Sequence, residues 1–367
     1  MTQGASAPQR RLSIVIAGGG TGGHLYPGIA VARELLRQHP DAEVSFAGTS
    51  RGLEARVVPR EGFALDVIRS AGLKGKSLRA RVRGAALLVP SALDAWRVLS
   101  RRSPDVVLGV GGYSSGPVVL LAALRGIPTM VIEQNAVPGL TNRWLARVVR
   151  AAAVTYDETR RFFGTRGFVA GNPVRPEFFT AVRTSRSDAG PRVLILGGSQ
   201  GAHVVNVAVV EAAPELARRC PGLELVHQTG ERDLAVVREG YARAGVAARA
   251  ESFLDPVVRE VIDADLVICR AGATTLAELA AAGRPAVLVP FGAATDDHQR
   301  RNARVLADAG AAVIVDEREL SGARLADVVA PLIADRARLE AMSAAMRRLA
   351  RPDAAARIVE RLLEIAA

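Results

Sequence analysis

Two glycine-rich turns, each directly after an apolar β-branched run, constrain this chain most. Gly-Gly-Gly-Thr-Gly-Gly-His at 18–24 follows the run 12–17, and Gly-Gly-Ser-Gln-Gly-Ala at 197–202 follows the run 193–196. Each turn leads into a helical pattern, so backbone N–H groups at the glycines should point to one spot beside a helix N-terminus, where anions are stabilised. The sequence therefore predicts two anion-binding turns and two anionic ligands, one per domain.

Short apolar strands alternate with helical patterns along the chain. Strands are expected at 12–17, 43–47, 106–110, 129–132, 193–196, 223–228, 266–269, 286–289 and 312–315. This alternation is typical of doubly wound parallel sheets. Because 367 residues are about twice the usual domain size, we expect an α/β fold with two such domains.

The boundary between the two domains is expected at Gly171–Pro176, where two prolines and a glycine disfavour a helix or a strand. We expect one domain over 10–171 and a second over 172–350. Pro352 separates a last helix, over 353–367, from the helix before it. The pattern leaves open whether this helix packs on its own domain or returns to the first.

The positive charge of the chain is concentrated in its first half. Residues 1–150 hold 20 Lys and Arg against 9 Asp and Glu, whereas residues 151–367 hold 28 of each class. The densest stretch, 69–83, is followed by the apolar residues 85–93. This pairing suits an anionic membrane surface, although a solvated basic loop is the alternative. No aromatic residues interleave with these charges, so we do not expect nucleic-acid binding.

Neither an export signal nor a membrane span is expected. The first ten residues are polar, and the uncharged stretch 106–124 is interrupted by four glycines and a proline. Cys220 and Cys269 lie in no CxxC or Cys/His cluster, which favours reduced, buried thiols. We therefore expect a cytoplasmic protein, at most peripheral on the membrane.

The first glycine turn formally matches the dinucleotide fingerprint G-x-G-x-x-G. A nicotinamide-dependent enzyme would need an acidic residue about 20 positions on to hold the ribose, but the second strand runs into Gly-Thr-Ser-Arg at 48–51. One dinucleotide would also leave the second turn unexplained. Two phosphate-binding domains suit a reaction between two phosphorylated molecules held at the carboxyl ends of the sheets, such as glycosyl transfer from a nucleotide sugar to a diphosphate-linked acceptor.

Seven motifs stand in the order found in one enzyme family. They are 18–28, GGYSSG at 111–116, EQN at 133–135, GNPVR at 171–175, GGSQGA at 197–202, 270–278 and DHQ at 297–299. Over residues 12–308 the chain resembles the MurG family of bacterial glycosyltransferases. The resemblance implies a GT-B architecture, two Rossmann-like domains facing a cleft. It also implies inverting transfer of GlcNAc from UDP-GlcNAc to the 4-hydroxyl of MurNAc in lipid I, giving lipid II for peptidoglycan synthesis.

The resemblance assigns the donor site mainly to the second domain. Ser199 and the surrounding amides would hold the UDP diphosphate, because charge develops on this leaving group. A third helix start is expected at 273–278, where amides and threonines suit phosphate. The carboxylate of Glu278, on the first turn of this helix, suits the ribose diol. The residues implied at UDP-GlcNAc are Thr21, Gly22, Gly23, Asn135, Arg175, Ser199, Leu254, Ala273, Thr274, Thr275, Leu276, Ala277, Glu278 and Gln299. Some relatives carry Gln at position 298, where this chain has His298.

In the first domain, Gly20 to Gly23 would face the acceptor diphosphate, and Tyr113 would contact the acceptor. A sugar hydroxyl must lose its proton as it attacks, and an imidazole suits this task. His24 is the expected base, and Glu133 is the competing base or the group that orients it. No cofactor or bound metal is expected, although a divalent cation could stimulate the reaction. Because lipid I is anchored in the bilayer, residues 68–96 are expected to dock on the cytoplasmic leaflet of the plasma (inner) membrane.

Two other function classes stay open. One is a different GT-B activity, such as a UDP-GlcNAc 2-epimerase or a glycolipid synthase with another acceptor. The other is a non-catalytic nucleotide-sugar-binding protein with this fold. The presence of His24, Glu133 and Glu278 argues against the non-catalytic protein. Turnover of UDP-GlcNAc, and the identity of the product, discriminate these classes.

Overall fold

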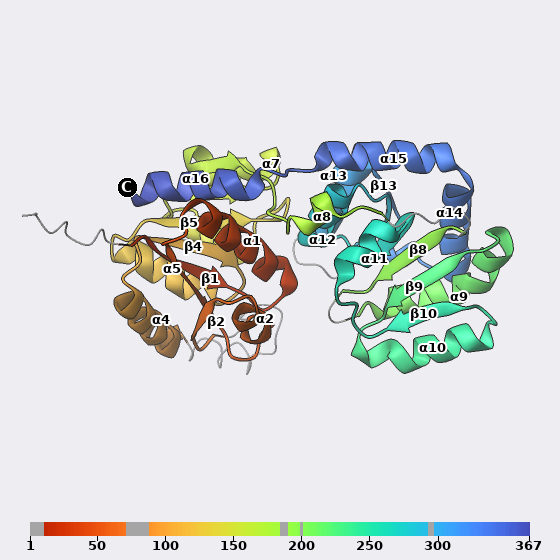
Figure 1. Cartoon of the computed structure of the whole chain (residues 1–367), viewed down its shortest axis with the longest axis horizontal. Coiled ribbons are helices and arrows are strands. Elements are labelled where there is room, and N and C mark those ends of the chain that lie inside the picture. Colours follow the sequence, from red (N-terminus) through yellow and green to blue (C-terminus); the bar gives the residue numbers. More distant parts are fainter. Residues whose placement is uncertain (1–10, 71–87, 184–189, 199–200, 293–296) are drawn as a thin grey trace, which may run out of the picture. The chain divides into compact units, whose positions relative to one another are not determined.

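The computed structural model of the chain describes residues 11–70, 88–183, 190–198, 201–292 and 297–367 (Figure 1). The basic residues expected to dock on a membrane, Lys74, Lys76, Arg79 and Arg81, lie outside these ranges, as does Ser199. The chain divides into two compact units. Unit 1 comprises Met1–Gln134, Pro138–Pro173 and Asp353–Ala367, and unit 2 comprises Asn135–Val137 and Val174–Pro352.

Unit 1 is built on a parallel sheet with the strand order β3-β2-β1-β4-β5-β6-β7. The strands are β1 (Ser13–Gly18), β2 (Glu43–Gly48), β3 (Ala64–Val67), β4 (Val106–Gly111), β5 (Thr129–Glu133), β6 (Ala151–Val154) and β7 (Gly167–Val169). The helices are α1 (Gly22–Gln38), α2 (Glu54–Arg60), α4 (Leu88–Arg102), α5 (Ser115–Leu124), α6 (Leu140–Leu145), α7 (Asp157–Arg160), the 3₁₀ helix η1 (Arg161–Arg166) and α16 (Ala354–Ala366).

Unit 2 is built on a second parallel sheet, with the order β10-β9-β8-β11-β12-β13. Its strands are β8 (Arg192–Leu196), β9 (Glu224–Gln228), β10 (Ala248–Glu251), β11 (Leu266–Cys269), β12 (Ala286–Leu288) and β13 (Ala312–Ile314). Its helices are α8 (Glu177–Thr180), α9 (His203–Arg219), α10 (Leu234–Arg243), α11 (Val257–Asp263), α12 (Ala273–Ala282), α13 (His298–Asp308), α14 (Gly322–Ala334) and α15 (Arg336–Leu349), with 3₁₀ helices η2 (Glu231–Asp233) and η4 (Glu317–Glu319).

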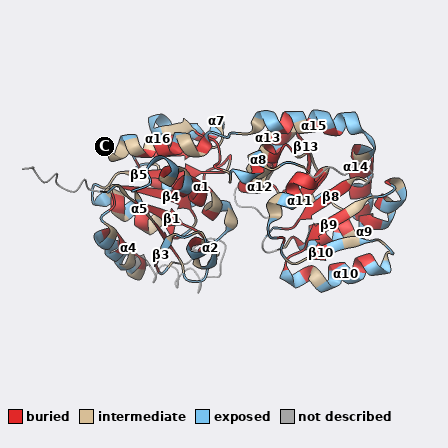
Figure 2. Ribbon diagram, in the orientation of Figure 1, coloured by how far each residue is buried: buried red, intermediate tan, exposed pale blue. Residues whose placement is uncertain are grey.

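Both sheets are buried on both faces (Figure 2). This agrees with their strands, which are apolar runs rich in β-branched residues. In unit 1, helices α1 and α16 cover one face while α4 and α5 cover the other. The C-terminal helix α16 packs on α1 through Ile358, Val359 and Leu362. These findings confirm the expected α/β class with two parallel sheets. Among the described residues, each helix is too short or too polar to cross a membrane.

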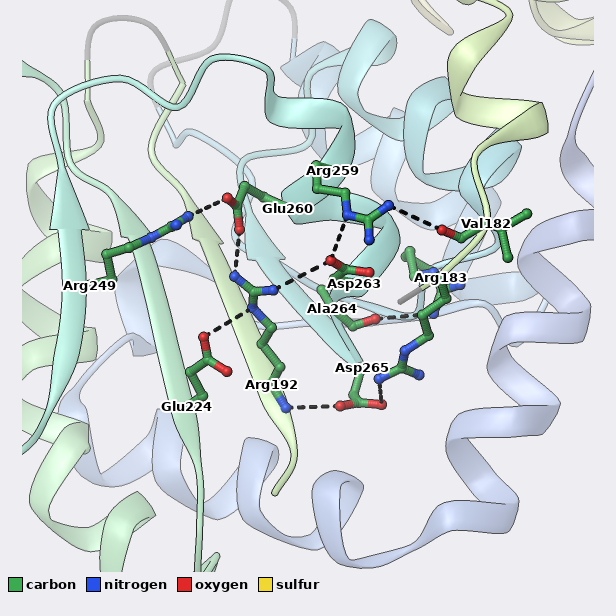
Figure 3. A network of polar contacts seen from close by, with 11 residues as sticks. Val182, Arg183, Arg192, Glu224, Arg249, Arg259, Glu260, Asp263, Ala264 and Asp265 are labelled. Carbon is green, nitrogen blue, oxygen red and sulfur yellow. Dashed lines mark hydrogen bonds and ion pairs between the residues drawn. The ribbon is translucent and has the colours of Figure 1, made fainter. Parts of the chain in front are cut away.

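An ion-pair network surrounds Arg192, the first residue of β8, at the N-terminal ends of the strands in the unit 2 sheet (Figure 3). The Arg192 side chain is 11% exposed, and its Nη2 lies 2.6 Å from Glu260 Oε2. Glu224 and Asp263 also lie within ion-pair distance of its guanidinium. Arg249 and Arg259 pair with the other sides of these acids. The network joins β8, β9, β10 and α11 at the edge opposite the second glycine turn.

Candidate functional site

The first glycine turn connects β1 to α1 and is shaped by the end of β4. Gly18 has a φ of +152°, and a Cβ at this residue would lie 2.6 Å from the carbonyl oxygen of Gly111. No other residue type fits this close approach of two backbones. The turn therefore places the start of α1 directly beside the carboxyl end of β4.

Glu54, which the sequence analysis did not single out, holds this turn in place. Its side chain is buried, and Oε2 accepts a hydrogen bond from the Gly20 amide at 2.7 Å. Oε1 accepts from the amide and the hydroxyl of Thr49, at 2.9 Å and 2.7 Å. A Cβ at residue 19, 48 or 52 would collide with the Glu54 side chain, so these glycines make room for it.

The contact with Glu54 occupies the backbone amide of Gly20. Its N–H donates to a carboxylate, and a contact of Gly20 with the acceptor stays a prediction. Burial raises the pKa of Glu54, but the hydrogen bonds from Gly20 and Thr49 outweigh burial and leave the pKa below its usual value. The group is therefore ionised at neutral pH, and its charge lies within the turn itself.

We expect Glu54→Gln to lower kcat/KM by about tenfold, because a buried backbone donor loses its acceptor. A glutamine side chain has one acceptor oxygen and one NH₂ group, whereas the amides of Gly20 and Thr49 both need an acceptor. Steady-state kinetics with both substrates tests this, with the exposed Asp41→Asn as the control. Wild-type kinetics in the Glu54→Gln variant would show that the turn does not depend on the carboxylate.

His24 lies in the first turn of α1, directly beside the glycine turn. Its Nδ1 is 3.4 Å from the Thr21 hydroxyl oxygen, and its ring lies against Gly111, where a Cβ would come within 2.8 Å of Nε2. Burial lowers the pKa of His24 to about 4, while the negative charge of Glu54 acts in the opposite direction. The imidazole is therefore neutral at neutral pH and able to accept a proton.

Glu133 is predicted as the competing base or as the group that orients the base. It ends β5 with 2% of its surface exposed, and its Oε2 accepts hydrogen bonds from the Gly139 amide and the Asn142 side chain, both at 2.9 Å. These hydrogen bonds hold the entry to α6, and the role of Glu133 as base or orienting group stays a prediction. Tyr113, between β4 and α5, is 55% exposed.

The second glycine turn is tied to two neighbouring strands through Gln228, which the sequence analysis also missed. The Gly197 amide donates to the Gln228 backbone oxygen at 3.0 Å, and the Gln228 side-chain NH₂ donates to the Gly198 oxygen at 3.2 Å. The Leu254 amide donates to Gln228 Oε1 at 3.0 Å. Leu254 therefore lies beside this turn, with its N–H already bonded, and its role at the nucleotide stays a prediction.

Helix α12 starts at Ala273 after the N-cap Gly272, which offers no side-chain cap to the first amides. This leaves the amide-rich helix start that the sequence predicts around Thr274 and Thr275. The Leu276 amide donates to the Gly272 oxygen, and its side chain is buried in the core, so its contact with the nucleotide stays a prediction. Ala277 follows it inside the helix.

The position of Glu278 differs from the expectation, because Glu278 lies on the second turn of α12 rather than on the first. Its Oε1 accepts a hydrogen bond from Arg175 Nη2 at 3.2 Å, and both side chains are largely buried. Burial raises the pKa of Glu278, partly offset by Arg175. The structure thus joins two residues that the sequence placed at the nucleotide separately.

Asn135 belongs to unit 2, whereas the sequence prediction assigned it to the first domain. Its Oδ1 accepts a hydrogen bond from Asn302 Nδ2 at 3.1 Å, and Asn302 Oδ1 accepts from the Ala136 amide at 2.9 Å. Asn302 is fully buried on α13, so it positions Asn135. On the same helix, Gln299 Oε1 accepts from the Phe291 amide at 3.0 Å. Its NH₂ group is the end that a sugar could meet.

Two further observations concern possible metal ligands and the cysteines. Over the described ranges, no group of three or more His, Cys, Asp or Glu side chains is arranged to hold a metal ion. Cys220 and Cys269 are buried free thiols, as expected.

Both units match models of one enzyme family. Residues 14–154 match the glycosyltransferase family 28 N-terminal domain, and residues 192–358 match the glycosyltransferase family 28 C-terminal domain. A curated relative from Anaeromyxobacter sp. (strain K) is 47% identical over 96% of this chain and 93% of its own length. The chain belongs to glycosyltransferase family 28.

Two family 28 relatives carry the same name. The Anaeromyxobacter protein and one from Myxococcus xanthus (strain DK1622) are both named UDP-N-acetylglucosamine--N-acetylmuramyl-(pentapeptide) pyrophosphoryl-undecaprenol N-acetylglucosamine transferase. The Myxococcus protein is 45% identical, over 95% of this chain and 92% of its own length.

Solved structures agree with the family 28 assignment. The crystal structure of Acinetobacter baumannii MurG matches with a TM-score of 0.76 and 31% identity, over 96% of this chain and 99% of that one. A putative UDP-N-acetylglucosamine 2-epimerase from Listeria monocytogenes matches with a TM-score of 0.72 but only 14% identity, over 95% of each chain. The epimerase likeness shows a shared fold alone, the GT-B architecture that the sequence analysis expected.

Proposed function

We infer that this chain is an N-acetylglucosaminyltransferase that moves GlcNAc from UDP-GlcNAc to lipid I, making lipid II for peptidoglycan synthesis. One observation carries the inference. The chain is 43–47% identical, over almost its whole length, to relatives named for this transfer. The alternative, an epimerase, is supported only by a shared fold.

For the donor, the residues of unit 2 divide into three roles. The second glycine turn, with Ser199, and the start of α12 at Ala273, Thr274 and Thr275 hold the diphosphate. Helix N-termini stabilise the charge that develops on UDP as it leaves. Glu278 accepts hydrogen bonds from the ribose diol, with Arg175 holding its carboxylate in position. Asn135 and Gln299 bind the GlcNAc.

We expect Glu278→Gln to raise the KM for UDP-GlcNAc by about tenfold, because hydrogen bonds to a charged group are worth about 1.5–3 kcal/mol. In the wild-type protein this KM should also rise as the pH falls through the raised pKa of Glu278, since a protonated carboxyl is a poorer acceptor for the diol. The Glu278→Gln variant should lack that rise.

Kinetics at several pH values test this role, with the exposed Glu319→Gln as the control. An unchanged donor KM in Glu278→Gln would remove Glu278 from the ribose role. A pH dependence that survives in this variant would assign the titration to another group.

For the acceptor, we propose that Thr21, Gly22 and Gly23 at the start of α1 face the diphosphate of lipid I, and that Tyr113 contacts the acceptor. The 4-hydroxyl oxygen of MurNAc attacks C1 of GlcNAc from the side opposite UDP. The new C–O bond forms as the bond to UDP breaks, which inverts the anomeric centre. His24 Nε2 takes the hydroxyl proton when Nδ1–H donates to the Thr21 hydroxyl oxygen.

The surface of unit 1 supports a peripheral position on the cytoplasmic face of the plasma membrane. On α4, Val89, Leu93 and Trp96 are more than half exposed and share one helix face, because they are spaced four and three residues apart. Helix α4 packs on α5, where Leu124 is 73% exposed, and the Arg125 guanidinium lies 4.5 Å from the centre of the Trp96 ring. Apolar side chains beside an arginine suit an anionic lipid surface.

We expect the double variant Leu93→Ser and Trp96→Ser to bind anionic vesicles at least about tenfold more weakly, because burying one such side chain is worth about 1.5–3 kcal/mol. Vesicle sedimentation measures this binding. Val236→Ser, on the exposed face of α10, is the control for losing an exposed apolar side chain. Equal binding by the double variant would exclude this patch as the docking surface.

The function itself is tested by transfer of radiolabelled GlcNAc from UDP-GlcNAc to a short-chain lipid I analogue, with UDP release followed in parallel. Label in the lipid product, matched by released UDP, supports the inference. UDP released without labelled lipid would point to an epimerase-like reaction or to another acceptor. Binding of UDP-GlcNAc with neither signal would indicate a non-catalytic protein.

A further inference from the structure

A pocket rich in arginine lies at the N-terminal ends of the strands in the unit 2 sheet. The second glycine turn lies at the C-terminal ends of these strands. The pocket has a volume of about 240 Å³. It is formed where β11 and β12 begin, and α15 closes it. Its charged lining consists of Arg183, Arg284, Arg336, Arg347, Asp265 and Glu340, and we call it the arginine pocket. Figure 3 shows Arg183 and Asp265 at these N-terminal strand ends.

The two acids of the arginine pocket are committed to other partners. Asp265 Oδ1 accepts from Arg183 Nη2 at 2.6 Å, and its Oδ2 accepts from the Arg192 amide at 2.8 Å. Glu340 lies 3.8 Å from Arg336 one helical turn away, and both side chains are at least 75% exposed. Neither carboxylate forms an ion pair with Arg284 or Arg347 in the described part of the chain.

Among the described residues, neither Arg284 nor Arg347 has a carboxylate at ion-pair distance. Within that part of the chain, Arg284 donates to the neutral carbonyl groups of Ala282 and Ala264, each at 3.1 Å. The Arg347 guanidinium lies against Gly283, where a Cβ would come within 2.8 Å of Nη1. It has no hydrogen-bond or ion-pair partner among the residues that the structure describes. Burial, followed by the charges of Arg183 and Arg347, lowers the pKa of Arg284 to about 10, while the charges of Asp265 and Asp263 act in the opposite direction.

The carbonyl end of α12 explains only part of this arrangement. Cations are stabilised at a helix C-terminus, and Arg284 bonds the Ala282 oxygen there. That contact does not account for the Arg347 guanidinium beside it, whereas Arg183 is already paired with Asp265. Arg284 and the exposed Arg347 repel one another, and an oxyanion between them would remove this repulsion and accept charge-assisted hydrogen bonds.

We propose that the arginine pocket binds a small oxyanion of the phosphate class, with Arg284 and Arg347 as its main ligands. Inorganic phosphate, pyrophosphate and the phosphate group of a small phosphomonoester share the required chemistry. The site is separate from the donor site and does not depend on the proposed transfer reaction. Its occupation would stabilise unit 2 by relieving the repulsion among the arginines.

Binding of pyrophosphate to the full chain tests the proposal, measured by titration calorimetry at constant ionic strength. The double variant Arg284→Gln and Arg347→Gln should lose one binding equivalent relative to the wild type. The double variant Arg218→Gln and Arg243→Gln, which removes two exposed charges elsewhere in unit 2, should keep it. Loss in both variants would indicate a general charge effect and contradict the site, and loss in neither would overturn it.

Thermal unfolding of the single variant Arg347→Gln separates binding from a structural role. In buffer without phosphate the variant should have a higher Tm than the wild type, because one of the repelling charges is gone. Pyrophosphate should raise the Tm of the wild type and do so less in the variant. A variant Tm below that of the wild type without phosphate would mean that Arg347 supports the fold, which would contradict the proposal. Phosphate and a phosphomonoester in place of pyrophosphate then distinguish the sources of the anion.

Discussion

Replacing His24 by alanine should lower kcat by about 10²–10⁴-fold, the usual contribution of a positioned general base. The neutral imidazole beside the glycine turn would no longer take the proton of the attacking hydroxyl. The KM values for UDP-GlcNAc and lipid I should change little, because the lost interaction belongs to the transition state. Steady-state kinetics with both substrates measures this split.

The control for His24 is His39→Ala, at the exposed C-terminal end of the same helix α1. This variant should keep the wild-type kcat. Thr21→Val gives a second readout, because it removes the hydroxyl that meets His24 Nδ1 and should lower kcat by a smaller factor. A His24→Ala variant with wild-type kcat would show that another group accepts the proton.

Replacing Arg192 by alanine should destabilise unit 2 by about 3 kcal/mol, because removing one partner of a buried ion pair leaves an uncompensated charge. Glu260 and Asp263 would each lose a cation, and only the more exposed Arg249 and Arg259 would remain beside them. Urea unfolding followed by far-UV circular dichroism should show an earlier transition.

The two tryptophans make this measurement specific to one unit. Trp96 and Trp144 both lie in unit 1, so tryptophan emission reports on that unit and should shift less than the dichroism signal. Arg218→Ala, which breaks an exposed pair with Glu215, should leave both transitions in place. An Arg192→Ala transition that matches the wild type would show that the network adds no stability.

The hydrophobic pattern of the sequence predicted much of the fold, because each expected strand is a short apolar run bounded by glycine-containing turns or by helical patterns. The nine expected strands are present, with ends that shift by a residue at most. The pattern missed β3, β6, β7 and β10, which are short. Ala-Ala-Ala-Val at 151–154 carries little β propensity, and Ala-Arg-Ala-Glu at 248–251 is an edge strand with polar side chains.

The glycine turns and the helix starts could be predicted for the same reason, since backbone conformation leaves a local signal in the sequence. The side chains that position these turns and helix starts leave no such local signal. Glu54 meets Gly20 across 34 residues, and Asn302 meets Asn135 across 167. Each is one polar residue on an ordinary amphipathic helix until the fold brings its partner near. The hydrogen-bond partners of Glu133, which are Gly139 and Asn142, likewise lie beyond the motif that contains it.

The central claim is tested most directly by the stereochemistry of the product. The protein is incubated with UDP-GlcNAc and a short-chain lipid I analogue, and the disaccharide is released and examined by proton NMR. We predict GlcNAc joined to the 4-position of MurNAc with the large anomeric coupling of a β linkage, as inversion of the α-linked donor requires. An α linkage, a different acceptor position, or an epimerised sugar nucleotide with no disaccharide would contradict the assignment.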